Sequence, residues 1–231
     1  MTDTPEVPIR DAASILVVDR DGPDGPAVLM GQRGKGAVFM PSKYVFPGGA
    51  VDKEDAAISL ARPLSDATAA RLAEDIRPES KATSASISAA ALRELAEETG
   101  LTVGEPGAAP QSWLRYAALE HIPDPSALIY LFRAITPKGR PRRFDARFLV
   151  LDASRVHGNR HDFSFAGDEL SHLHWVPLKQ ARKLDLPFIT EVVLAELSEL
   201  VARAGDGPLS DPPDVPFFDN RDETPRFHRI A

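Results

Sequence analysis

The stretch Arg93-Glu94-Leu95-Ala96-Glu97-Glu98-Thr99-Gly100-Leu101 places three carboxylates and an arginine within a turn and a half of a predicted helix. At about 100° per residue, the three glutamates share a helical face roughly 100° wide, and the apolar side chains lie on the other side. Like charges four residues apart destabilise a helix slightly. This crowding indicates a cation that offsets the repulsion, and carboxylate ligands suit a hard ion such as Mg²⁺ or Mn²⁺.

A second fragment lies upstream, Phe46-Pro47-Gly48-Gly49-Ala50-Val51-Asp52-Lys53-Glu54-Asp55. Its two glycines permit backbone angles that are barred to other residues and let the chain approach a ligand closely. Together the fragments resemble the signature of Nudix hydrolases, G-x5-E-x7-R-E-U-x-E-E-x-G-U, in which U is a bulky aliphatic residue. The helical half matches at every fixed position, and R-E-x-x-E-E-x-G has a chance of roughly 10⁻⁴ of arising in such a chain at average residue usage.

Two departures from the signature concern its first half. Asp55 stands where a glutamate is expected, and thirty-seven residues rather than seven separate it from Arg93. The inserted segment, roughly 56–85, is predicted to be helical around 66–75, as a lid over the site or as a contact in a homodimer. The two halves need to meet in space rather than in sequence. The resemblance implies that Asp55 chiefly braces Arg93, with geometry weakened by the shorter side chain.

The resemblance implies an α/β fold, a Nudix-type α/β/α sandwich with a central mixed sheet and a helical insertion. Periodicity alone indicates only a mixed α/β domain. The signature helix is predicted from near Ser84 or Ser86 to Gly100, and a last amphipathic helix over 189–203. Strands are predicted at 13–18, 27–33, 44–46, 114–119, 128–135, 144–151 and 172–176.

We expect residues 1–231 to form one domain, with a core of about 11–203, the insertion at about 56–85 and a Pro-rich tail at about 204–231. The tail is too rich in proline and charge for a core element. Its aromatic pair, Phe217-Phe218, suggests that it docks on the body of the protein or on a partner.

Composition excludes several classes of function. The chain has 27 Lys and Arg against 34 Asp and Glu, and a net charge of −7 argues against nonspecific nucleic-acid binding. The absence of cysteine excludes disulfides, thiolate zinc sites and cysteine nucleophiles. No apolar run approaches the ~20 residues of a membrane span. The first residues show no secretory signal, so a cytoplasmic location is expected, without nucleic-acid or membrane partners.

The reaction implied by the resemblance is hydrolysis of a diphosphate that is linked to another group. Glu94, Glu97 and Glu98, with the carbonyl of Gly48, would hold Mg²⁺ or Mn²⁺, which lowers the pKa of an attacking water. Arg93 would brace the acids rather than touch the substrate.

The general base is either Glu94 itself or a glutamate on a later loop. Asp168 and Glu169 precede a predicted strand, and Glu169 is the preferred candidate of the two. The alternative interpretation of this pair is a solvated turn.

Further segments resemble the Nudix branch that contains a peroxisomal coenzyme A diphosphatase, namely Gln32-Arg33, 39–49, 135–137, 142–148 and the interrupted signature. The implied substrate is nucleotide-like, in the narrowest case coenzyme A or acyl-coenzyme A. A coenzyme A motif, L-L-T-x-R-[SA]-x3-R-x3-G-x3-F-P-G-G, is half met. The aligned positions are Leu29, Arg33 and Phe46 to Gly49, and the replaced positions are Gly31, Gly34, Val38 and Ser42.

Candidate substrate-binding residues are Arg33 and two members of a basic cluster, Arg143 and Arg147. A phosphate could bind this cluster. The alternative is a strand whose arginines point into solvent while the intervening phenylalanines point the other way.

Two other functions stay open on the sequence alone. One is a Nudix-like module that senses a nucleotide without cleaving it, against which the intact acid triad argues. The other is a structural domain whose insertion and tail mediate assembly.

Overall fold

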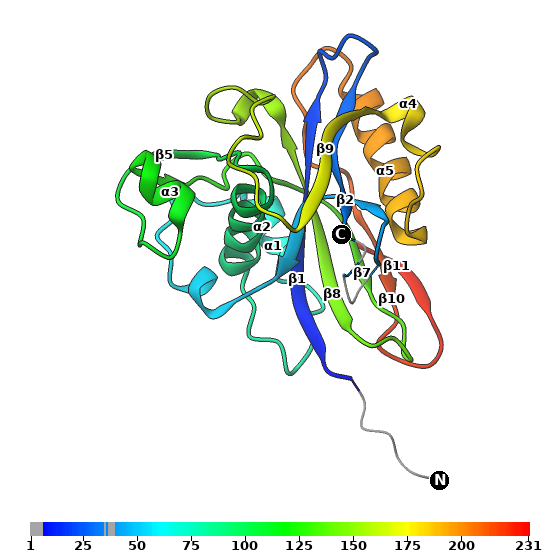
Figure 1. Ribbon diagram of the computed structural model, residues 1–231. Helices are drawn as coiled ribbons and strands as arrows, with labels where there is room; N and C mark the ends of the chain where they lie inside the picture. Colours follow the sequence, from blue (N-terminus) through cyan, green and yellow to red (C-terminus); the bar gives the residue numbers. More distant parts are fainter. Residues whose placement is uncertain (1–6, 35, 37–39) are drawn as a thin grey trace.

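The computed structural model describes residues 7–34, 36 and 40–231. One mixed sheet runs through the molecule (Figure 1), in the order β11-β10-β7-β8-β1-β2-β3, with β4 paired to β1 and β9 paired to β2. Strand β8 is parallel to β1 and antiparallel to β7. The strands of this sheet are β1 (Ile9–Asp19), β2 (Ala27–Arg33), β3 (Tyr44–Val45), β4 (Gly48–Ala50), β7 (Ile129–Ile135), β8 (Arg143–Asp152), β9 (Leu170–Pro177), β10 (Val215–Asp219) and β11 (Arg226–Ile230).

Helices cover both faces of this sheet. In Figure 1, α1, α2 and α3 lie on one side, and α4 and α5 lie on the other. The helices are α1 (Asp66–Leu72), α2 (Ser84–Thr99), α3 (Leu114–Leu119), α4 (Leu178–Ala181) and α5 (Phe188–Ala204), with 3₁₀ turns η1 (Lys53–Ala56) and η2 (Ala153–Arg155). A separate two-stranded sheet joins β5 (Gly104–Pro106) to β6 (His121–Pro123). This arrangement confirms the predicted α/β/α sandwich.

The central strands show why the layers form. Along β1, Ala13, Ile15 and Val17 pack into the core shared with α2, whereas Leu16 and Val18 pack into the core shared with α5. Side chains of a strand alternate between its faces. A strand that is covered on both sides therefore reads as a continuous apolar run, as this one does.

Local signals set the ends of α2. Thr83 caps its first turn, because its side chain accepts a hydrogen bond from the backbone N–H of Ser86. Gly100 ends the helix in a left-handed conformation, with φ of 77°. A Cβ on Gly100 would also lie 2.8 Å from Cβ of Phe165, so both the backbone angle and the space require glycine. The predicted helix is confirmed.

The predicted strand at 114–119 is wrong, because these residues form α3. Only Tyr116 is buried within them, and Trp113, three residues earlier, is buried beside it. Buried positions three apart follow a helical period, and Leu, Arg and Ala favour a helix.

The composition of the tail predicts that it lies outside the core, and the structure contradicts this. Strand β10 pairs in parallel with β7 and antiparallel with β11, which extends the main sheet. Val215 and Phe217 are fully buried, and Ile230 is 2% exposed. Pro216 precedes the residues that register with β7, so its missing N–H interrupts no bond of that ladder.

The insertion is partly helical and packs on the same chain. Helix α1 is shorter than predicted and contacts α2 and β7. Arg71 donates hydrogen bonds to the carbonyls of Pro212 and Pro213, at 2.7 and 2.9 Å, and Thr68 donates to Asp211 at 2.8 Å. The insertion and the tail therefore stabilise each other through these hydrogen bonds. Within the described ranges, no helix is long and apolar enough to cross a membrane.

Candidate active site

The two halves of the signature meet in space. Strand β4 lies along β1, and the backbone N–H of Gly48 donates a 2.8 Å hydrogen bond to Oε2 of Glu98 on α2. A Cβ on Gly49 would clash with the carboxylate of Glu94, and one on Gly48 would lie 2.5 Å from the carbonyl oxygen of Ala13. Glycines are needed here because backbone, sheet and carboxylates approach closely.

Arg93 braces the acids, as the signature implies. Its Nε and Nη2 donate to both oxygens of Asp55, at 2.8 and 3.1 Å, and Nη2 also donates to the carbonyl of Ala50. Its Nη1 donates to Glu94 at 2.8 Å and to Glu97 at 3.0 Å. The geometry expected to be weakened by aspartate is a bidentate pair instead, because the 3₁₀ turn η1 brings Asp55 close.

Glu94 and Glu98 are two neighbouring carboxyl groups that are largely shielded from solvent. Burial raises the pKa of Glu94 to about 7, although the charge of Arg93 opposes this shift. Burial and the nearby charge of Glu94 raise the pKa of Glu98 well above its usual range. Glu98 is 3% exposed, and its Oε1 has no hydrogen-bond partner among the described residues. Burial and the neighbouring carboxylate therefore disfavour the charged form of Glu98.

Arg33 and Glu169 lie beside these acids. The charge of Glu169 raises the pKa of both Glu94 and Glu98, and the charge of Arg33 lowers that of Glu98. Nη2 of Arg33 lies 3.8 Å from Oε2 of Glu169. The Glu169 side chain is 69% exposed, and Nε of Arg33 is buried without a hydrogen-bond partner in the part of the chain that the structure describes.

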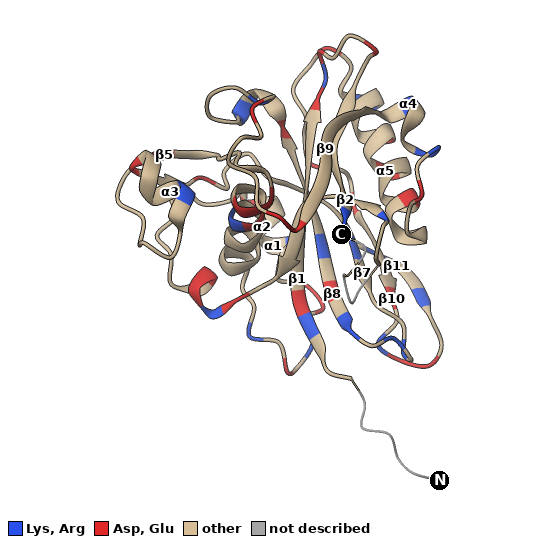
Figure 2. Cartoon of the chain, viewed as in Figure 1, with Lys and Arg blue, Asp and Glu red and all other residues tan. Residues whose placement is uncertain are grey.

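The loop that carries Glu169 is tied to α2. The N–H of Gly167 donates a 2.8 Å hydrogen bond to the carbonyl of Glu97. In Figure 2 the acidic end of this loop, just before β9, faces the acidic stretch of α2. The structure thus brings together Arg33, Gly48, Arg93, Glu94, Glu97, Glu98 and Glu169.

Arg143 and Arg147 do not join this site, and both expectations for them are contradicted. They are 2% and 1% exposed, so they face neither a phosphate nor solvent. Arg143 donates to the carbonyl of Asn220 at 2.8 Å, and Arg147 pairs with Asp11 at 2.6 Å and with Asp145 at 3.3 Å. Strand β8 lies inside the sheet, and the insertion and tail cover its end.

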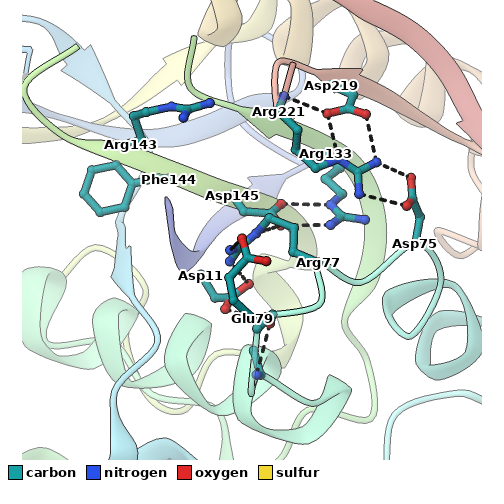
Figure 3. A network of polar contacts seen from close by, with 12 residues as sticks. Asp11, Asp75, Arg77, Glu79, Arg133, Arg143, Phe144, Asp145, Asp219 and Arg221 are labelled. Carbon is teal, nitrogen blue, oxygen red and sulfur yellow. Dashed lines mark hydrogen bonds and ion pairs between the residues drawn. The ribbon is translucent and has the colours of Figure 1, made fainter. Parts of the chain in front are cut away.

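Arg147 belongs to a buried network that centres on Asp145 (Figure 3). Asp145 is fully buried and accepts hydrogen bonds from Arg77 at 2.9 Å and from Arg133 at 2.8 Å. Burial acts to raise the pKa of Asp145, but the bonds from Arg133 and the charge of Arg147 outweigh it, so the pKa lies below its usual range. The sequence held a signal for this: Arg143, Asp145 and Arg147 alternate on one strand face, which predicts paired charges.

A ready-made metal cage is absent from the described residues, since no three His, Cys, Asp or Glu side chains converge in that way. Arg93 holds an oxygen of Glu94 and one of Glu97, whose side chain is 53% exposed. Gly48 holds one oxygen of Glu98.

Comparison with known proteins identifies the fold. No protein-family model matches the sequence, and no curated protein matches it. A Nudix hydrolase from Alicyclobacillus acidocaldarius matches in structure with a TM-score of 0.58, at 24% identity, over 82% of this chain and 90% of that one. The chain has the Nudix fold.

Two further solved structures match with lower TM-scores. The Nudix domain of Shewanella oneidensis NrtR, solved with ADP ribose, has a TM-score of 0.49 at 12% identity, over 83% of this chain and 88% of that one. A C. elegans Ap4A hydrolase has a TM-score of 0.45 at 15% identity, over 84% of this chain and 99% of that one.

Proposed function

We propose that this protein hydrolyses a diphosphate linkage in a small nucleotide-type molecule, with Mg²⁺ or Mn²⁺ as its cofactor. The observation that carries the proposal is the pair of carboxylates formed by the partly buried Glu94 and the buried Glu98, set against Gly48 and Gly49. One oxygen of Glu98 has no hydrogen-bond partner among the residues described. A buried charge without a partner is destabilising, and a cation from solution would offset it.

The donor set fits a hard divalent cation, which prefers carboxylate and carbonyl oxygens. Glu94, Glu97 and Glu98, with the carbonyl of Gly48, would hold the ion. Bound there, it would polarise the phosphoryl oxygens and lower the pKa of a water molecule.

The remaining residues act through their own groups. Arg93 keeps Glu94 and Glu97 in position through two hydrogen bonds from Nη1. Arg33, whose side chain is 25% exposed beside Glu169, would donate from its guanidinium to oxygens of the substrate diphosphate. Glu169 is exposed beside the acids, where its carboxylate can accept a proton from the attacking water.

A substrate panel with Mg²⁺ tests the proposal: ADP-ribose, NADH, coenzyme A, acyl-coenzyme A and dinucleoside polyphosphates. Glu98→Gln keeps an acceptor for the N–H of Gly48 but removes the charge, and should lower kcat at least about 10²-fold. The matched control is Glu191→Gln on α5, which lies on the other face of the sheet and should keep full activity.

Normal turnover by Glu98→Gln would contradict the mechanism. Tight binding of one compound without turnover of any would favour the nucleotide sensor instead.

Coenzyme A or acyl-coenzyme A is the narrower substrate that the sequence resemblance adds to this proposal. Its support is Arg33 and the Phe46 to Gly49 segment, in register with the coenzyme A motif. Val38 and Phe39, which also entered that resemblance, lie outside the described residues. The panel tests this choice directly, because the other compounds share the diphosphate but differ in the attached group.

A further inference from the structure

The loop that carries Glu169 also presents an exposed aromatic side chain. Phe165 is 58% exposed. Its backbone lies against the end of α2, because a Cβ on Gly100 would come within 3.0 Å of the carbonyl carbon of Phe165. Two residues later, Gly167 donates its N–H to the carbonyl of Glu97. Phe165 is therefore held about one helical turn, roughly 5 Å, beyond Glu97.

Arg115 fixes the ring of Phe165 from one side. The guanidinium carbon lies 3.7 Å from the ring centroid, a cation–π contact. The same guanidinium donates through Nε to the carbonyl of Gly100 at 3.1 Å, where α2 ends. The ring is thus positioned on a charged support that is itself anchored to α2. More than half of Phe165 stays open to solvent in spite of this support.

A single exposed aromatic side chain is ordinary on a protein surface. Phe165 differs because Arg115 fixes its ring and because its loop is bonded to the residue that precedes Glu98. A preformed aromatic surface of this kind favours a flat, apolar-faced ligand group.

We propose that Phe165 is the stacking platform for the planar group of the substrate, a nucleobase attached to the diphosphate. This inference rests on the proposed function, since it takes Glu94 and Glu98 as the place where the diphosphate binds. A nucleoside joined to a diphosphate at these acids extends over the end of α2 to the ring of Phe165. Arg115 is a positioning residue in this arrangement, because it acts through Phe165.

Kinetics on two kinds of substrate test the platform. Phe165→Ala should raise KM for nucleoside diphosphate derivatives about tenfold, with kcat within twofold of wild type, because stacking is lost while the acids are intact. KM for 5-phosphoribosyl diphosphate, which has a diphosphate but no base, should not change. Phe165→Trp should restore the low KM. The matched control is Phe188→Ala on α5, 70% exposed on the other side of the sheet.

A binding measurement separates this inference from the proposed function. The fluorescence of Phe165→Trp, read against wild type, should be quenched by ADP and unaffected by inorganic pyrophosphate, whether or not any compound is hydrolysed. If the wild type turns over no compound but ADP still quenches Phe165→Trp, the proposed hydrolase activity is contradicted and the stacking role of Phe165 is supported. An unchanged KM in Phe165→Ala, an equal rise for 5-phosphoribosyl diphosphate, or no quenching by ADP would overturn the platform.

Discussion

At the scale of single residues, Arg93 explains how three acids can share one helical face. One guanidinium bonds Asp55 through two nitrogens and reaches Glu94 and Glu97 through a third. Asp55 is 2% exposed, so its charge depends on this partner. The repulsion that the sequence implies is therefore partly offset within the chain, and the part that is not offset lies at Glu98.

Arg93→Lys should disturb both stability and activity. Lysine is a point charge without the planar fork, so it cannot bond both oxygens of Asp55 and also reach Glu97. We expect the free energy of unfolding to fall by about 3 kcal/mol, measured in urea, because the buried Asp55 loses its bidentate partner. The double variant with Asp55→Asn should fall by clearly less than the sum of the single variants. Strict additivity would show that the two side chains do not interact.

Glu94 makes stability depend on pH in the metal-free protein. Its pKa is raised from 4.5 to about 7, so the folded state binds this proton more tightly than the unfolded state. The contribution is most favourable below pH 4.5 and is lost as pH rises through about 7. Relative to Glu94→Gln, the wild type should lose up to roughly 3 kcal/mol between pH 4.5 and 8.

Denaturant unfolding of both proteins at several pH values, in EDTA, checks this sign. Mg²⁺ at pH 8 should stabilise the wild type and shrink the difference, because it binds only the folded state. If the free-energy difference between the wild type and Glu94→Gln grew toward low pH instead, the raised pKa of Glu94 would be contradicted.

At the scale of elements, the parts that sequence predicts well are the ones whose causes are local. Helix α2 has its cap, its apolar positions and its terminal glycine within 83–100, and the prediction holds almost to the residue. Helix α3 is not predicted, because it buries only Tyr116 and therefore shows too few buried positions to distinguish a helical period from that of a strand. The local alternation of charge along β8 predicts paired charges, but Arg147 and Arg143 also have partners 136 and 77 residues away, at Asp11 and Asn220, and no local pattern reveals the burial that these partners bring.

The buried network at Asp145 should matter more than any exposed ion pair. Asp145→Asn leaves three buried guanidiniums without their shared carboxylate, and should lower the free energy of unfolding by about 3 kcal/mol. The matched control, Asp214→Asn, removes a partly exposed partner of Arg229 and should cost less than about 1 kcal/mol. Chemical denaturation measures both. Equal effects would mean that water already screens the network.

At the scale of the whole molecule, the insertion and the C-terminal tail stabilise each other and the central sheet. Two arginines of the insertion make these contacts: Arg77 donates a hydrogen bond to Asp145 in the sheet, and Arg71 donates to backbone carbonyls of the tail. The tail supplies β10, which covers the edge of β7. The sheet therefore ends at β11 rather than at β7. The acids of α2 thus sit on a scaffold that is closed by residues far from them in sequence.

The aromatic pair of the tail distinguishes a core strand from a docked tail. Phe217 is fully buried and lies 4.2 Å from the guanidinium of Arg133, whereas Phe218 is only partly buried. Phe217→Ala should lower the free energy of unfolding by roughly 3–5 kcal/mol, since it leaves a cavity between β10 and the helices. Phe218→Ala should lower it less than half as much. Urea unfolding followed by far-UV circular dichroism compares them. If the tail merely docks on the body, either variant loses β10 and β11 while the rest of the sheet unfolds at an unchanged urea midpoint. If the tail is part of the core, the protein unfolds in one cooperative transition, and Phe217→Ala lowers its midpoint far more than Phe218→Ala does.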